Sequence, residues 1–173
     1  VFGKFGHLLG RVHKKFNRKV HVIKPFPLNE QDWTTYKALD PHPRVQDHVL
    51  YLSVNKKGQK IVTGELLNEG AIKQLHVRML DFETKMKMRI EDRIIDPSAF
   101  NDDQHRQEKS VGSQLFDLGE NWIRCSKNLM AGIKRLEDAF DYEIIAGKFI
   151  KAPELLIFDT CPTTIKQLEE YVW

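Results

Sequence analysis

The sequence has only two cysteines and no long apolar run, and both absences exclude classes of protein. Cys125 and Cys161 have no metal-ligand spacing, so we expect reduced, structural thiols in an intracellular protein. The longest apolar runs, such as Leu155–Phe158, fall far short of the roughly 20 residues of a membrane-spanning helix. The N-terminus lacks the continuous apolar stretch of a signal peptide. With 173 residues, 41% of them apolar and 29% charged, the chain predicts one soluble domain.

Several enzyme motifs are also missing from the chain. There is no Gly-x-x-x-x-Gly-Lys-Ser/Thr sequence, which excludes a P-loop ATPase on these residues. No Gly-x-Ser-x-Gly or Cys–His arrangement indicates nucleophilic catalysis. The seven histidines have no His-x-x-x-His or Cys/His spacing, so we expect no zinc site.

Acidic residues are absent from the first 24 positions, which contain seven lysines and arginines. Subtracting these from the totals of 27 basic and 24 acidic residues leaves 20 basic and 24 acidic residues in the rest of the chain. The N-terminal segment is therefore a local basic patch on a slightly acidic body. Such a patch suits a polyanion such as DNA, and a solvated surface hairpin is an equally good interpretation.

Hydrophobic periodicity predicts three strands followed by alternating helices and strands. Ile72, Leu75, Met79, Phe82 and Met86 are spaced 3, 4, 3 and 4 residues apart, which is typical of an amphipathic helix. The predicted strands cover residues 34–40, 48–54, 60–66, 93–96 and 155–159. The predicted helices cover residues 70–88, 111–118 and 128–140, and a last one begins at residue 162. Alternating residues between positions 10 and 23 predict a hairpin or two short strands.

The order of these elements predicts the fold class. The first three strands follow one another in quick succession and should form an antiparallel meander. The later strands alternate with helices, which implies parallel strands joined by right-handed crossovers and flanked by helices. An α/β mixed sheet in this order is the pattern of the ribonuclease H-like fold.

Three predicted strands end on an aspartate, in Leu39-Asp40-Pro41, Ile95-Asp96-Pro97 and Phe158-Asp159-Thr160. Ligand sites of open sheets lie beyond the carboxyl ends of the strands, so these positions are where chemistry is expected. If the first two strands are neighbours, their carboxylates converge and repel each other unless a cation lies between them. Carboxylate oxygens are hard ligands that suit Mg²⁺ or Mn²⁺. Two such ions, about 3.5–4 Å apart, would promote phosphodiester hydrolysis.

Each aspartate also has a structural interpretation. Asp159 is better interpreted as the capping residue of a strand-to-helix turn, because Pro162 opens a helix directly after it. Asp96 could belong to a Pro-Ser turn. No helix pattern follows Asp40, so its structural interpretation is weaker. From the residues alone, metal site and turn residue are equally good interpretations of the pair.

Four segments together resemble the C-terminal nuclease domain of the large terminase subunit of tailed bacteriophages. They cover essentially the whole chain, and their order is more specific than any one of them. The segments are Gly10–Phe16 with Val20–Ile23 and Pro25-Phe26 (entry hairpin), Ala38–Arg44 (first catalytic strand and turn), Ile94–Ala99 (second acidic motif) and Phe158–Pro162 leading to Tyr171–Trp173 (late structural motif).

The resemblance implies a ribonuclease H-like, RuvC-type endonuclease that cuts concatemeric viral DNA with two divalent metal ions. Asp40 and Asp96 carry over as metal ligands. The family supplies another aspartate in a helix just after the Tyr-Val-Trp region, so this ligand is expected beyond Trp173. The implied partners are double-stranded DNA, the terminase ATPase domain, which would precede residue 1, the small terminase subunit and the portal. The implied location is the host cell cytoplasm.

Within this frame we expect one nuclease domain over residues 1–173, with a basic entry hairpin at 1–27 and a ribonuclease H-like core at 28–173. Asp47 is a weaker metal candidate, for which a surface turn is the better interpretation. The candidates for DNA phosphate contacts, which position DNA without reading its sequence, are Lys14, Lys15, Arg18, Lys19 and Arg44. Two alternatives stay open: a non-catalytic DNA-binding or motor-coupling module of the same fold, and a resolvase- or transposase-like nuclease.

Overall fold

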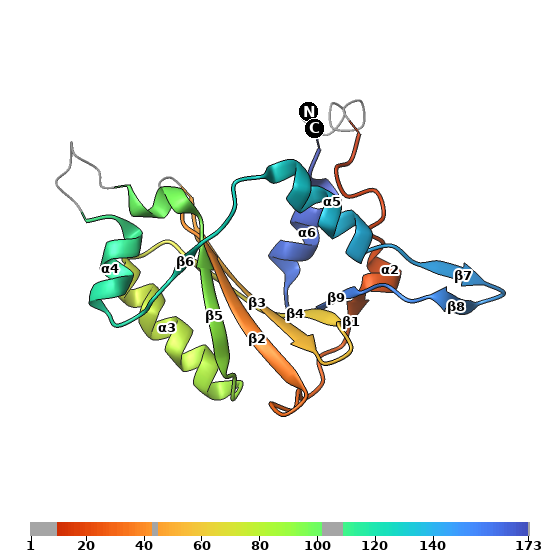
Figure 1. Ribbon diagram of the computed structural model, residues 1–173, viewed down its shortest axis with the longest axis horizontal. Coiled ribbons are helices and arrows are strands. Elements are labelled where there is room, and N and C mark those ends of the chain that lie inside the picture. Colours follow the sequence, from red (N-terminus) through yellow and green to blue (C-terminus); the bar gives the residue numbers. More distant parts are fainter. Residues whose placement is uncertain (1–9, 43–44, 102–108, 173) are drawn as a thin grey trace.

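The computed structural model describes residues 10–42, 45–101 and 109–172 (Figure 1). Its strands are β1 (Val22–Ile23), β2 (Trp33–Asp40), β3 (Asp47–Asn55), β4 (Lys60–Asn68), β5 (Ile90–Ile95), β6 (Ile123–Arg124), β7 (Glu143–Ile145), β8 (Lys148–Lys151) and β9 (Leu155–Phe158). Its helices are α2 (Arg18–His21), α3 (Ile72–Lys85), the short 3₁₀ helix η1 (Pro97–Phe100), α4 (Val111–Asp117), α5 (Leu129–Ala139) and α6 (Pro162–Glu170). None of these described helices is long and apolar enough to cross a membrane.

Seven of the strands form one mixed sheet in the order β1-β9-β4-β3-β2-β5-β6. The meander β2-β3-β4 is antiparallel. By contrast, β5 runs parallel to β2, β6 parallel to β5, and β9 parallel to β4. The sequence-based expectation of a meander followed by parallel strands is confirmed. The chain has a ribonuclease H-like α/β fold.

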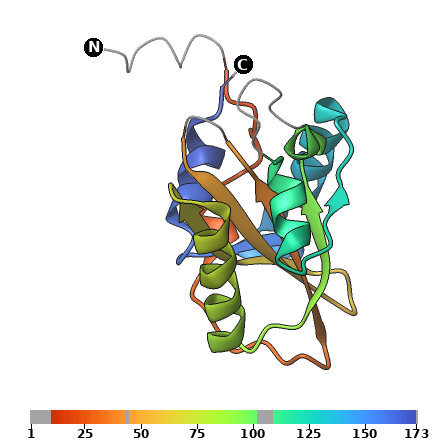
Figure 2. The same ribbon diagram turned by 90° about the vertical axis from the view of Figure 1, so that its left-hand side faces the viewer.

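One face of the sheet is covered by α3 and α4, which lie side by side across it (Figure 2). The apolar positions that recur every three or four residues of α3 form its buried face, as the sequence predicts. Leu75 and Met79 of α3 and Leu115 of α4 are fully buried against Val49 and Tyr51 of β3. This packing holds one face of the central strands β2, β3 and β5.

Within this face lies a buried charge cluster centred on Lys37, in the middle of β2. Its ammonium is fully buried and donates to Glu83 of α3 at 2.8 Å and to both carboxylate oxygens of Glu120 at 3.2 Å. The Tyr51 hydroxyl also donates to Glu83, at 3.1 Å. A buried lysine is compatible with folding here because two carboxylates compensate its charge.

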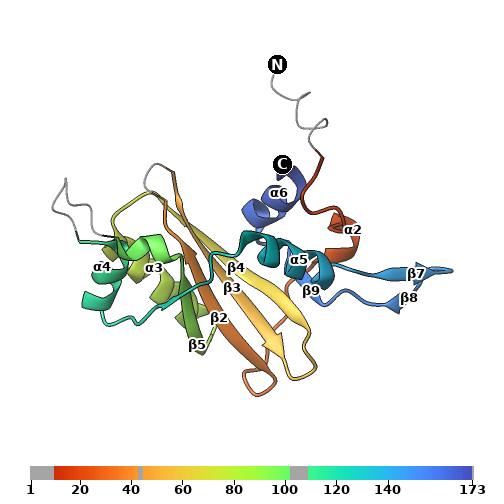
Figure 3. The same ribbon diagram turned by 45° about the horizontal axis from the view of Figure 1, so that its top comes forward.

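The opposite face carries α5 and α6, and Figure 3 shows both helices on the far side of the sheet from α3 and α4. Their core includes Phe140 at the end of α5, Ile165 of α6 and Ile157 of β9. Phe16, from the N-terminal segment, packs into the same cluster. Phe16 thus anchors the described part of the N-terminal segment in the second core.

The prediction of a hairpin between residues 10 and 23 was wrong. The structure has the four-residue helix α2 followed by the short strand β1, which pairs in parallel with β9. The side chain of Asn17 caps α2 by accepting the Lys19 N–H at 3.0 Å. The buried His21 ring contacts the Phe140 carbonyl oxygen at 2.9 Å. The local cap, the His21 contact and the pairing of β1 with the distant β9 set the conformation of this segment.

A two-stranded antiparallel hairpin, β7–β8, lies outside the main sheet and extends away from it (Figures 1 and 3). Ala146 and Gly147 form its turn, both with positive φ values, 49° and 77°. Ile145, Phe149 and Ile150 are more than half exposed on it. The sequence analysis did not assign this hairpin.

Candidate functional site

Asp40 and Asp96 lie next to each other at the carboxyl ends of two neighbouring parallel strands. The register pairs Leu39 of β2 with Ile95 of β5, so the residues that follow them face each other across the strand pair. Adjacent strands of a sheet are generally about 4.8 Å apart, so residues that directly follow a paired position on both strands lie close together. The structure therefore brings together the two aspartates that the sequence analysis singled out.

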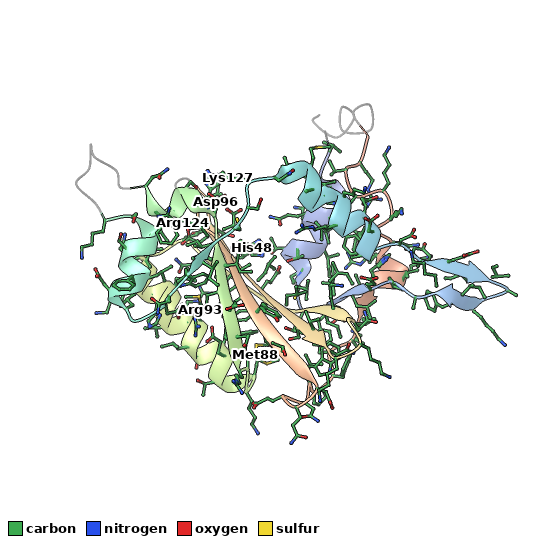
Figure 4. All side chains as sticks on the ribbon, viewed as in Figure 1. His48, Met88, Arg93, Asp96, Arg124 and Lys127 are labelled. Carbon is green, nitrogen blue, oxygen red and sulfur yellow. The ribbon has the colours of Figure 1, made fainter. Side chains whose placement is uncertain are left out.

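The two carboxylates share one face of the sheet. Leu39 and Ile95 are buried in the core beneath α3. Because side chains alternate between the faces of a strand, Asp40 and Asp96 project toward the opposite face, on the side of α5 and α6. Figure 4 shows Asp96 at the end of β5, at the rim of the sheet.

The carboxylate of Asp96 is held in place by the turn that follows it. Its Oδ1 accepts the Ser98 N–H at 2.7 Å and also the Ser98 hydroxyl, so that Asp96 caps η1. The two hydrogen bonds from Ser98, and then the positive charge of Lys127, hold the pKa of Asp96 below its ordinary value of 3.8. The Pro-Ser turn expected as an alternative interpretation is present. It fixes one oxygen and leaves Oδ2 without a hydrogen bond among the described residues.

The Asp40 carboxylate, unlike that of Asp96, is not held by hydrogen bonds from the described residues. Asp40 is exposed at the end of β2, where its backbone pairs with His48 of β3. Across the described ranges, no side chain or backbone group donates a hydrogen bond to its carboxylate. Two neighbouring carboxylates could hold a hard divalent cation, because the cation would remove their mutual repulsion.

Asp47 occupies a structural position. Its side chain is buried, and its two oxygens accept the His42 N–H at 3.2 Å and the Asn68 amide at 3.1 Å. These bonds connect the loop after β2 to the end of β4. A role for Asp47 at a metal therefore stays a prediction, and the interpretation as a turn residue has direct support.

Asp159, the third strand-end aspartate, lies well away from the pair. Three strands, β4, β3 and β2, separate β9 from β5 in the sheet order. Its carboxylate accepts the Lys24 ammonium at 2.5 Å. It does not cap α6 as the sequence suggested, because α6 is capped by Glu65 of β4.

Glu65 accepts the N–H groups of Thr163 and Thr164 at 2.8 and 2.9 Å. On its other side it contacts the imidazole of His48, Nε2 to Oε2, at 3.3 Å. Because His48 is the cross-strand partner of Asp40, Glu65 connects the first turn of α6 to the edge of the site. This link could not be predicted from the sequence, because no local signal marks a cap that comes from 98 positions away.

Of the predicted DNA-contacting cations, two are engaged in ion pairs. Lys15 lies 2.9 Å from Asp141, and Arg18 lies 3.3 Å from Glu169. Lys14 and Lys19 are exposed and line the same hollow, of about 570 Å³, as Lys15 and Arg18. Arg44 lies outside the described residues.

The described ranges bring together no group of three or more acidic, histidine or cysteine side chains that could hold a metal ion. The site thus consists of two carboxylates. The further ligand that the resemblance implies was expected beyond Trp173.

No protein-family profile matches the chain, and no curated protein matches its sequence. Solved structures do match its fold. The large terminase of a thermophilic bacteriophage, in complex with ATP-gamma-S, aligns with 95% of this chain at a TM-score of 0.73 and 18% identity. This chain spans 38% of that protein's length.

Two isolated nuclease domains match over most of their length. The P22 large terminase nuclease domain aligns with 94% of this chain and 79% of its own length, at a TM-score of 0.66 and 15% identity. The large terminase nuclease from thermophilic phage G20c, with bound zinc, aligns with 94% of this chain and 88% of its own length, at a TM-score of 0.52 and 9% identity. The chain has the fold of phage large-terminase nuclease domains.

Proposed function

We propose that the chain is a divalent-metal-dependent endonuclease domain that cuts concatemeric viral double-stranded DNA during genome packaging. The observation that carries this proposal is the parallel register of β2 and β5, which sets Asp40 beside Asp96 at the end of the sheet. The likeness to the nuclease domains of P22 and G20c supports the same interpretation through the fold.

Asp40 and Asp96 would hold Mg²⁺ or Mn²⁺, because their oxygens are hard ligands and Asp40 is free of other described hydrogen bonds. A bound pair of such ions supplies an activated water and stabilises the leaving oxygen in phosphodiester cleavage. Ser98 keeps Asp96 ionised and oriented through its two hydrogen bonds. Asp47 would act at most from the adjoining loop, whose conformation it fixes.

The substrate contacts and partners extend from this proposal. Lys14, Lys15, Arg18, Lys19 and Arg44 would contact DNA phosphates as a non-specific positioning surface. The site would act in the host cell cytoplasm, together with the terminase ATPase domain, the small terminase subunit and the portal. Residues 1–173 would form one nuclease domain, with the N-terminal basic segment built into its second core.

Cleavage of supercoiled plasmid in Mn²⁺ or Mg²⁺, with and without chelator, tests the proposal. The wild-type chain should nick the plasmid, and Asp40→Asn and Asp96→Asn should abolish nicking. Asp159→Asn is the matched control, because it removes a strand-end aspartate far from the pair. Plasmid that stays intact with a chain extended past Trp173, which supplies the further expected ligand, at concentrations that retard plasmid migration would contradict the proposal.

One observation favours a second candidate function, a non-catalytic DNA-binding or motor-coupling module. Only two candidate ligands converge among the described residues. Such a module would bind DNA and leave it uncut in either metal, so the same assay separates the two functions.

A further inference from the structure

We infer that Lys127 and Arg135 bind the DNA backbone beside Asp96, so that the segment from β6 to α5 forms a phosphate-binding wall of the cleavage site. This inference rests on the proposed nuclease function. It extends that function from the metal ligands to the strand that they would cut.

A groove of about 760 Å³ connects these residues. Asp96, Lys127 and Arg135 all line it, at the end of β5, on the coil before α5 and on α5 itself. Asp96 is the only carboxylate among its described lining residues. The groove therefore leads from the candidate metal ligand along a wall whose other full charges are positive.

The backbone fixes this wall at the side of Asp96. β6 pairs in parallel with β5, with Arg124 opposite Ile95, and the Cys125 N–H donates to the Ile95 carbonyl oxygen at 2.9 Å. Lys127 follows two residues later and lines the same groove as Asp96. Figure 4 shows Lys127 and Asp96 together at the upper end of the strands, with Arg124 beside them.

Among the described residues, Lys127, Arg135 and Arg124 differ from Lys15 and Arg18 in forming no ion pair with an acidic side chain. Arg124 is held over the Phe100 ring, 4.4 Å from its centroid. A cation already paired must lose its partner before it binds phosphate, so the unpaired ones bind a polyanion at lower cost.

The charges around the site also favour DNA binding at this wall. Two strand-end carboxylates repel a phosphodiester in the absence of metal. The three cations Arg124, Lys127 and Arg135 outnumber the two carboxylates of Asp40 and Asp96. Lysine and arginine are the side chains that most often contact DNA phosphates.

Fluorescence anisotropy with a short labelled DNA duplex in EDTA tests the inference without metal or turnover. Lys127→Gln should weaken binding by about 3–10-fold at low salt and reduce the slope of log Kd against log salt by about 1. Arg135→Gln should act in the same direction. Lys134→Gln is the matched control, because this neighbour on α5 is exposed and does not line the groove.

Asp96→Asn, in the same metal-free assay, tests where the DNA lies. Removing a carboxylate next to bound phosphate should tighten binding, and Lys127→Arg should restore the affinity lost in Lys127→Gln. Equal affinities for the wild type, Lys127→Gln, Arg135→Gln and Lys134→Gln would overturn the inference, as would an Asp96→Asn variant that binds DNA no more tightly than the wild type.

Comparison with plasmid nicking separates this inference from the proposed function. If the chain nicks DNA but binds it independently of Lys127 and Arg135, the proposed nuclease function is supported and the phosphate-binding role of these two residues is refuted. If the chain does not nick DNA but Lys127→Gln lowers its affinity for DNA, the nuclease function is refuted and the phosphate-binding role of Lys127 is supported.

Discussion

Glu65 and Thr164, 99 positions apart in the chain, are joined by two hydrogen bonds. One carboxylate oxygen of Glu65 accepts both the Thr164 N–H, at 2.9 Å, and the Thr164 hydroxyl, at 2.7 Å. A β4 side chain thus caps α6, whose own preceding residue, Cys161, provides no side-chain cap. The first turn of α6 is thereby fixed to the strand beside the one that carries His48.

This cap predicts a pH-dependent stability. Burial alone would raise the pKa of Glu65, but the hydrogen bonds from His48, Thr163 and Thr164 outweigh it and lower the pKa from 4.5 to about 2. A lowered pKa in the folded state stabilises the protein above pH 4.5, and this contribution is lost as the pH falls toward 2. Glu65→Gln should therefore cost about 2–3 kcal/mol in the free energy of unfolding at pH 7.

Urea unfolding of the wild type and Glu65→Gln across the acidic range provides the measurement. The difference between their unfolding free energies should shrink steadily below pH 4.5. A difference that stays constant down to pH 2 would show that Glu65 is not the titrating group.

The buried Lys37 cluster predicts an asymmetric response to substitution. Lys37→Met removes the ammonium that pairs with the buried Glu83 and leaves Glu120 with only Arg93 and His76 as basic neighbours among the described residues. This change should cost about 3–5 kcal/mol in unfolding free energy. Adding Glu83→Gln and Glu120→Gln should recover part of this loss, because the uncompensated charges are removed. Denaturant unfolding of the single and triple variants measures both effects, and a Lys37→Met variant as stable as the wild type would refute the account.

The close packing around Gly64 of β4 predicts that a larger side chain at this position destabilises the protein. A Cβ atom at this position would overlap the ring of Phe82, which packs on Tyr51 with ring centroids 4.8 Å apart. Gly64→Ala should lower the unfolding free energy by about 1–3 kcal/mol. Gly132→Ala, on α5, meets no atom within 4 Å and should be neutral or stabilise by up to about 1 kcal/mol. Thermal unfolding of both variants gives the comparison, and equal effects would contradict the packing described for β4.

Much of the central fold could be predicted because its signals are local. The period of α3, the turns between β2, β3 and β4, and the aspartate-proline ends of two strands can all be read from short stretches of sequence. The structure places each of these elements within a few residues of its expected bounds. The proximity of Asp40 and Asp96 followed once β2 and β5 were taken as neighbours.

The features that could not be predicted depend on contacts between distant segments. The helix α2 forms where an alternating pattern indicated strands, because His21 is held by Phe140. The cap of α6 comes from Glu65, far away in the sequence. Lys127 can be recognised as a neighbour of Asp96 only once the pairing of β6 with β5 is known. The hairpin β7–β8 is the exception, because it has a local signal: two short runs with isoleucines around Ala146-Gly147.

The central claim is that Asp40 and Asp96 hold a divalent metal ion together, and Mn²⁺ binding by isothermal titration calorimetry tests it most directly. The wild type and Asp159→Asn should bind Mn²⁺ alike, whereas Asp40→Asn and Asp96→Asn should each lose at least about tenfold in affinity. Circular dichroism should show all four proteins folded. Equal Mn²⁺ affinity for the wild type, Asp40→Asn and Asp96→Asn would contradict the claim.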